Sequence, residues 1–147
     1  MAYQFKVSSI PREVIDGIVD EVECGMICFL NPVTHKHVSV FGDSYWGHDE
    51  EFDREIYDEV DQWERFIRID PMESFESFKV MASFIESDCF DRDLDMKRRL
   101  IDAISGPKPF RRFKHLVETS QYRQLWFRFR RRAIEEYVKE QIGYSQI

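Results

Sequence analysis

Two groups of basic residues near the carboxyl end have the chemistry to bind a negatively charged partner. In the segment GPKPFRRFK, residues 106–114, Pro109 suits the first turn of a helix, where free backbone amides attract anions. The second group lies in FRFRRR, residues 127–132, where arginines alternate with aromatic residues. The candidate residues for binding an anion or an acidic partner are Lys108, Arg111, Arg112, Lys114, Arg128, Arg130, Arg131 and Arg132.

The arginine-rich segment leaves the class of partner open. Arginine interleaved with aromatic residues is typical of proteins that follow a nucleic-acid backbone through phosphate contacts and base stacking. However, the helical spacing of Trp126 and Phe129 predicts that both are core residues, and the chain's formal charge of −7 has the wrong sign for a nucleic-acid footprint. We therefore expect a protein with an acidic surface as the partner, with nucleic acid as the alternative.

Acidic residues are concentrated in segment 43–61, which holds nine of them. A glycosidase-like hydrolase needs two carboxyl groups, one of them in a dry pocket that raises its pKa. Among nine acids some pair always has a suitable spacing, so a hydrolase is an alternative and we expect no catalytic residue. Asp91, Asp93 and Asp95 imitate the start of a calcium loop, but Met96 stands where that loop needs glycine.

Histidines and cysteines around a predicted hairpin offer a possible zinc-like arrangement. His35 and His37 would project from one face of a strand, and Cys24 and Cys28 from one face of the preceding segment. No CxxC knuckle supports this arrangement, and free cysteine is usually a small buried apolar residue. The six glycines form neither a GxGxxG nor a GxSxG pattern. We therefore expect no metal and no cofactor.

Composition indicates a single globular domain spanning residues 1–147. Apolar residues make up 43% and aromatic residues 15%, which excludes the composition of a disordered chain. No run of 18 apolar residues exists and the opening residues lack signal-peptide features, so we expect no membrane partner. Three cysteines are an odd number with no disulfide spacing, which favours a reducing compartment and a cytoplasmic location.

Charge is distributed unevenly along the chain. Residues 1–40 carry a formal charge of −2, residues 41–105 carry −11 and residues 106–147 carry +6. This division has two explanations: either the basic end docks on the acidic middle of the same chain, or the chain offers two surfaces to partners of opposite charge.

The elements that would position these residues follow from apolar periodicity and turn residues. We expect an antiparallel sheet of about three strands preceded by a helix and followed by about four helices packed on it, which is an α+β fold. Asp70 is expected to cap a helix that begins at Pro71, and Gly106 to end the next one. The predicted ranges are helix 11–23, strands 26–30, 37–41 and 65–69, a partial helix within 42–61, and a last helix over 121–142 that stops before Gly143.

Apolar stripes predict the buried face of each later helix. The side chains expected on those faces are Phe75, Phe78, Ala82, Ile85, Leu94, Ile101, Ile104, Phe110, Phe113, Leu116, Val117, Tyr122, Leu125, Trp126, Phe129, Ala133 and Tyr137.

Three segments, in their order and spacing, resemble the bacterial uncharacterised protein family 0158: FIRIDPMESFESFKVMASFIE, GPKPFRRFKHLVE and LWFRFRRRAIEEYVKE. The hairpin segment FLNPVTHKHVSV is also similar to the opening of that family, whereas the acidic stretch 43–61 matches no pattern of it. The resemblance implies bacterial origin and a stand-alone small α+β domain. It implies no activity, ligand or catalytic residue, so the function expected from the residues is a cytoplasmic interaction or regulatory module.

Overall fold

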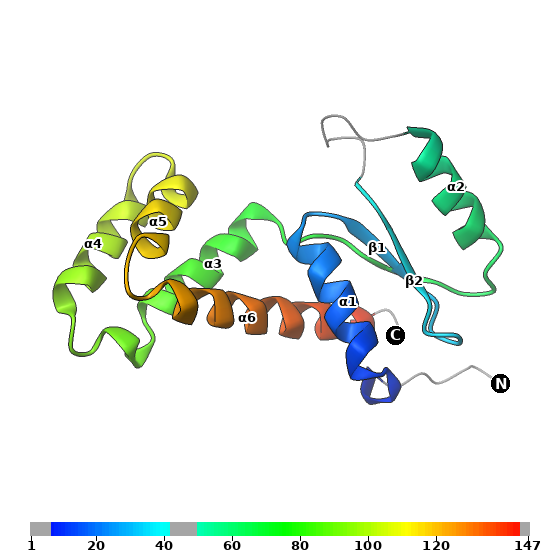
Figure 1. The fold of residues 1–147 in the computed structure, drawn as a ribbon, viewed down its shortest axis with the longest axis horizontal. Helices are drawn as coiled ribbons and strands as arrows, with labels where there is room; N and C mark the ends of the chain where they lie inside the picture. Colours follow the sequence, from blue (N-terminus) through cyan, green and yellow to red (C-terminus); the bar gives the residue numbers. More distant parts are fainter. Residues whose placement is uncertain (1–6, 42–49, 145–147) are drawn as a thin grey trace. The chain divides into compact units, whose positions relative to one another are not determined.

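The computed structural model describes residues 7–41 and 50–144, and the chain has the predicted α+β fold (Figure 1). The helices and strands, in chain order, are η1 (Val7–Ser9), α1 (Arg12–Glu23), β1 (Ile27–Leu30), β2 (His37–Val40), α2 (Glu50–Asp61), β3 (Ile67–Ile69), α3 (Ser74–Ile85), η2 (Asp88–Phe90), α4 (Leu94–Ser105), α5 (Pro109–Glu118) and α6 (Arg123–Tyr144).

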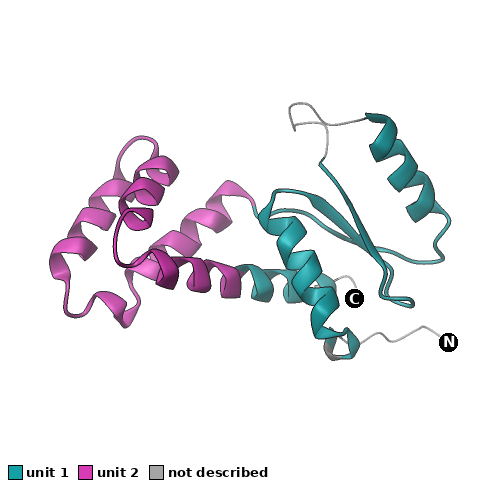
Figure 2. Cartoon of the chain, in the orientation of Figure 1, with its two compact units in different colours: residues 1–72, 134–147 teal, residues 73–133 magenta. Residues whose placement is uncertain are grey.

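The chain divides into two compact units (Figure 2). Unit 1 comprises residues 1–72 and 134–147, and unit 2 comprises residues 73–133. Helix α6 supplies side chains to the cores of both units, Trp126 to unit 2 and Val138 to unit 1. That the two units fold together as a single domain over residues 1–147 stays a prediction.

Unit 1 is built on a three-stranded antiparallel sheet in the order β2-β1-β3. Leu30 pairs with His37 on one side and with Ile67 on the other. Because side chains alternate along a strand and paired residues share a face, this register puts Cys28, Leu30 and His37 on one face of the sheet. Phe29 and Val40 lie on the other face.

The face that carries Leu30 is covered by α1 and by the second half of α6. Ile18 and Val19 of α1 and Val138 and Ile142 of α6 are buried against it, which explains the four-residue spacing of apolar residues in both helices. The opposite face holds a smaller cluster of Phe29, Val40 and Val60, the last of them from α2. The helical interpretation of the acidic stretch is thus confirmed for residues 50–61, whereas residues 43–49 lie outside the described ranges.

The core of unit 2 is aromatic. The ring of Phe84 lies 5.3 Å from that of Phe90, 5.2 Å from that of Trp126 and 6.4 Å from that of Phe113, measured between ring centroids. Helices α3, α4, α5 and the first half of α6 contribute to this cluster. The Tyr122 hydroxyl also donates a 2.7 Å hydrogen bond to Asp93, whose carboxylate caps α4 by accepting from the Met96 amide.

Two helix boundaries correct the sequence-based expectations. Helix α3 begins at Ser74 rather than Pro71, because Glu73 and Glu76 form a reciprocal capping box that satisfies the first backbone amides. Helix α6 continues through Gly143 to Tyr144, so that glycine does not end it. Gly106 and Pro109 mark the end of α4 and the start of α5 as predicted.

Several apolar side chains that were expected in the core are exposed: Phe75 is 55% and Leu94 63% exposed, and Ile101, Phe110 and Leu125 are also exposed. In α4 the buried positions are Leu100 and Ala103 instead. A wide apolar stripe identifies a helix, but it does not say which edge of the stripe meets the neighbouring helix.

Candidate functional site

Helix α5 begins in a way that is unfavourable for its own stability. Lys108 occupies the position before the helix with a left-handed backbone, φ 52°, and its side chain makes no capping hydrogen bond. The first turn contains no acidic residue to balance the positive end of the helix dipole. Pro109 supplies the fixed φ that starts the helix. The sequence therefore places positive charge where a helix by itself favours negative charge.

The predicted residues of α5 are all on the surface. Lys108, Arg111, Arg112 and Lys114 are exposed. Within residues 7–41 and 50–144, none of these four side chains forms an ion pair. The acidic residues of those ranges thus leave the positive charge of α5 available to an external group.

Arg112 differs from its neighbours because it lies over Gly106. A Cβ atom added to Gly106 would be 2.3 Å from Nη1 of Arg112. This position sets the guanidinium beside the C-terminal end of α4, where positive charge is favourable next to the last carbonyls. Part of the role of Arg112 is therefore to stabilise the turn between α4 and α5.

The predicted arginines of α6 are less uniform. Arg128 and Arg132 are exposed, and Nε of Arg128 donates to the Gln124 carbonyl at 3.4 Å. Arg130 and Arg131 are half-buried and have partners within the structure. Phe129, the aromatic residue between Arg128 and Arg130, packs against the core of unit 2 and is only partly exposed, which disfavours its stacking on a base.

The division into units coincides with a division of charge. Unit 2 holds 14 basic and nine acidic residues, a formal charge of +5, and unit 1 holds seven basic and 19 acidic residues, a formal charge of −12. The candidate basic residues all belong to unit 2. The charge asymmetry seen along the sequence is therefore also a property of the folded units.

The described acids of segment 43–61 lie on α2. Asp53 is buried, whereas Glu50, Glu51, Glu55 and Asp58 are exposed to solvent. A carboxylate dyad for hydrolysis needs two acids in a shared pocket. Among the described residues of α2, Asp53 is the one buried carboxylate, so this helix by itself does not supply such a pair. The hydrolase stays a hypothesis.

A second cluster of polar groups lies in unit 1, where the sequence had indicated a different set. The carboxylate of Glu21 on α1, the thiol of Cys28 on β1 and the imidazole of His37 on β2 have one ligand-type atom each within 4.8 Å of the others. Nδ1 of His37 lies 3.2 Å from the Glu21 carboxylate. The fold brings Cys28 and His37 together, one residue from each of the two pairs that the sequence had offered as a zinc-like arrangement without support. It places Cys24 on the surface and His35 in the turn.

Gly17 makes room for the ring of His37. A Cβ atom at this position in α1 would be 2.9 Å from both Cε1 and Nε2 of His37, so the imidazole rests on the helix backbone. Glu21 lies one helical turn further along the same face. The edge of the ring with Nε2 is therefore covered, and Nδ1 is directed toward the carboxylate.

The electrostatics of this cluster follow from burial and from Glu21. Burial and the neighbouring carboxylate of Glu21 raise the pKa of the Cys28 thiol far above its usual range. The hydrogen bond to Glu21 raises the pKa of His37, although partial burial acts in the opposite direction. Sequence reasoning missed Glu21; the signal that could have found it is Gly17 in the middle of an amphipathic helix, four residues before an acid on the same face.

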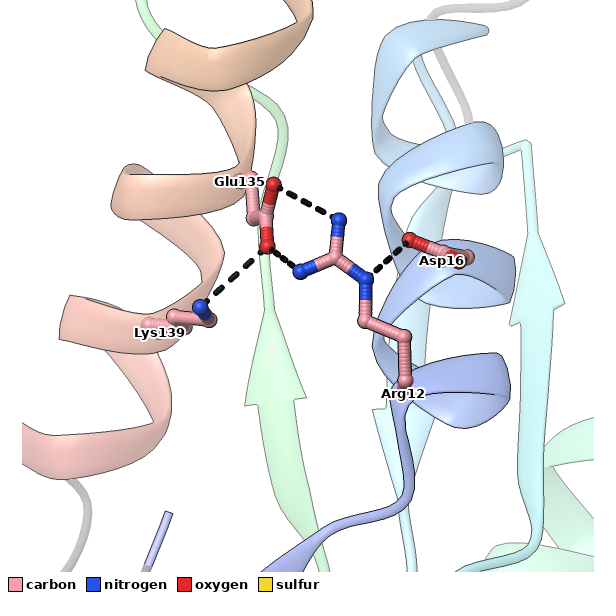
Figure 3. A network of polar contacts seen from close by, with 4 residues as sticks. All are labelled: Arg12, Asp16, Glu135 and Lys139. Carbon is pink, nitrogen blue, oxygen red and sulfur yellow. Dashed lines mark hydrogen bonds and ion pairs between the residues drawn. The ribbon is translucent and has the colours of Figure 1, made fainter. Parts of the chain in front are cut away.

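A polar network on the surface of unit 1 ties the start of α1 to α6 (Figure 3). The Arg12 guanidinium binds both carboxylate oxygens of Glu135, with Nη2 3.2 Å from Oε2, and its Nε lies 3.3 Å from Asp16. Lys139 approaches Glu135 to 3.2 Å. Burial acts to raise the pKa of Glu135, but the hydrogen bonds and charges of Arg12 and Lys139 hold it below its ordinary value. This network therefore stabilises the packing of α1 against α6.

Comparison with known proteins gives one match. Residues 38–146 match the model of the Uncharacterised protein family (UPF0158), which covers most of the chain, so the chain belongs to that family as its sequence segments indicated. Comparisons with curated proteins and with solved structures give no match. Within the described residues, none of the helices has the length and apolar character needed to cross a membrane.

Proposed function

We propose that this family member is a binding module whose unit 2 holds a protein partner with an acidic surface. The contact site is the basic surface, defined here as Lys108, which precedes α5, Arg111, Arg112 and Lys114 of α5, and Arg128 and Arg132 of α6. The observation that carries the proposal is the coincidence of two features: positive charge is collected in unit 2, and the side chains of α5 form no ion pairs with the described residues.

The start of α5 strengthens this proposal. A left-handed lysine, an absent cap and three basic residues near the positive end of a helix each oppose folding. Local features that disfavour stability are expected at binding sites. Here a bound carboxylate would offset the repulsion between the basic side chains and the positive end of the α5 dipole. A negatively charged partner would therefore stabilise this end of α5.

The chemistry of the surface favours an acidic protein over nucleic acid. Non-specific binding of single strands depends on aromatic side chains that stack on bases. Trp126 is buried and Phe129 packs in the aromatic core of unit 2, which leaves the arginines of α6 without the stacking platform that their sequence had indicated. Charge pairing with carboxylates needs no such platform.

The remaining expectations belong to the same proposal. The module acts by binding and not by catalysis, and it works in a bacterial cytoplasm. A reducing compartment suits its three cysteines, which are free, with Cys24 exposed. An oxidising compartment would leave that thiol open to disulfide exchange.

The binding test uses fluorescence anisotropy of the full chain with two labelled probes, an oligo-glutamate peptide and an oligonucleotide of equal charge. We expect the peptide to bind in a salt-sensitive manner, and the variant Lys108→Ala/Arg111→Ala to weaken binding about tenfold. The matched control is Arg92→Ala/Arg98→Ala, which removes two exposed arginines of unit 2 outside α5. Equal losses in both variants would mean that only net charge matters and would contradict the site. Tighter binding of the oligonucleotide would favour the nucleic-acid alternative.

A further inference from the structure

The cluster of Glu21, Cys28 and His37 contains the donor types that a borderline divalent metal prefers. Thiolate sulfur, imidazole nitrogen and carboxylate oxygen are the three ligand classes of zinc sites in proteins. Each of the three residues comes from a different element of unit 1, namely α1, β1 and β2. Helix α1 and strand β1 contribute to one buried core, and β2 is paired with β1 in the sheet, so the donors lie on regular elements and not on a loop.

The distances agree with the edges of a coordination tetrahedron. Bonds of about 2.0 Å to nitrogen and oxygen and about 2.3 Å to sulfur imply donor separations of roughly 3.3 to 3.6 Å. The separation between Nδ1 of His37 and the Glu21 carboxylate is 3.2 Å, and all three donor atoms lie within 4.8 Å of one another. The longest donor separation thus exceeds the tetrahedral edge by at most about 1.2 Å, a difference that small side-chain rotations can remove.

The three side chains of the cluster differ in exposure, which suits a metal ion with one coordination position open to solvent. Cys28 is fully buried, whereas the side chains of Glu21 and His37 are 23% and 24% exposed. Solvent can therefore reach the cluster from the side of Glu21 and His37, where a water molecule would complete four-fold coordination. Gly17 fixes which imidazole nitrogen takes part, because the backbone of α1 covers the edge with Nε2 and leaves Nδ1 directed toward Glu21.

From this geometry we propose that Glu21, Cys28 and His37 form a binding site for a divalent transition-metal ion, with zinc as the preferred metal. Binding replaces the thiol proton of Cys28 and uses the lone pair of neutral His37, so it releases protons to solvent. The two anionic donors neutralise the charge of the ion, which removes the repulsion between thiolate and carboxylate in a largely buried place. The site is independent of the basic surface, since all its residues belong to unit 1.

The test measures metal binding by the untagged full chain. We expect one zinc ion per chain by elemental analysis, and cobalt substitution should give the absorption band of a cobalt–thiolate bond. Cys28→Ser should abolish that band. Glu21→Gln should weaken metal affinity by at least about 100-fold, because mutation of a residue that only hydrogen-bonds to a metal ligand already weakens affinity about 10- to 100-fold. The matched controls are Cys24→Ser and His35→Asn, which alter the neighbouring cysteine and histidine outside the cluster and should leave affinity unchanged.

Two kinds of result would overturn the proposal. One is a chain that keeps its circular dichroism spectrum and binds neither zinc nor cobalt at equimolar concentration. The other is metal binding that is unaffected by Glu21→Gln or is lost equally in the Cys24→Ser control. If Cys28→Ser fails to fold, the cobalt spectrum of the unaltered chain together with the affinity of Glu21→Gln decides the question, because the Glu21 side chain is only partly buried.

Discussion

The imidazole ring of His37 rests directly on the backbone of α1 at Gly17, so close that a Cβ atom there would be 2.9 Å from two ring atoms. Glycine in the middle of a helix usually costs about 1 kcal/mol relative to alanine. That cost is offset here because the ring fills the space above the glycine. The contact joins β2 to α1 and orients the His37 side chain.

Gly17→Ala should therefore destabilise the protein, against the helix propensity of alanine. We expect the free energy of unfolding to fall by about 1 to 3 kcal/mol, the usual cost of forcing an added methyl group into packed surroundings. Urea unfolding followed by circular dichroism measures this change.

Gly143 provides the matched control, because it also lies within a helix but has only an ordinary contact of 3.9 Å to Val7 at the position of an added Cβ. Gly143→Ala should raise the free energy of unfolding by up to about 1 kcal/mol. If Gly17→Ala stabilised the protein as Gly143→Ala does, the close packing of His37 against Gly17 would be contradicted.

The network around Glu135 predicts a specific dependence on pH. Its pKa is lower in the folded chain than the ordinary value of 4.5, so its contribution to stability is complete above that value and is lost as the pH falls through the folded pKa. Glu135→Gln should lower the free energy of unfolding by about 1 kcal/mol at pH 7. The difference between the two proteins should shrink as the pH is lowered below about 4.5. A difference that is constant from pH 7 to pH 3 would contradict the role assigned to Arg12 and Lys139.

The aromatic cluster of unit 2 depends on Phe84. Its ring is buried and lies near those of Phe90, Phe113 and Trp126, so Phe84→Ala should cost about 3 to 5 kcal/mol. Phe75→Ala, on the same helix but 55% exposed, should change stability by less than about 0.5 kcal/mol. Thermal unfolding of the two variants checks this contrast, and similar losses in both would place the core of unit 2 elsewhere.

Local sequence signals were sufficient for most helices and strands. Apolar periodicity identified α1, and Gly106 with Pro109 marked the junction of α4 and α5. The capping box at Glu73 was missed because Asp70 and Pro71 offered an equally plausible helix start. Competing caps of this kind are resolved by tertiary packing, since the Tyr137 hydroxyl donates to the Asp70 carbonyl and holds that residue outside the helix.

The candidate sites were predictable only in part. The basic residues of α5 could be named from sequence because exposure and a helix start follow from local pattern. Which arginines of α6 are exposed could not be predicted from sequence, because the partners of Arg130 and Arg131 depend on which helix faces meet. The cluster in unit 1 needed the register of β1 with β2 and the position of α1, and neither is encoded by the spacing of histidines and cysteines.

The basic surface of unit 2 is tested most directly by mapping where an acidic ligand binds. Nuclear magnetic resonance spectra of the full chain, recorded while an oligo-glutamate peptide is added at low ionic strength, report the answer residue by residue. We expect the amide shifts of residues 106–118 to change most, and these changes to disappear in Lys108→Ala/Arg111→Ala. Shifts that move equally throughout unit 1, or no shifts at all, would contradict the proposal that this protein binds its partner through α5.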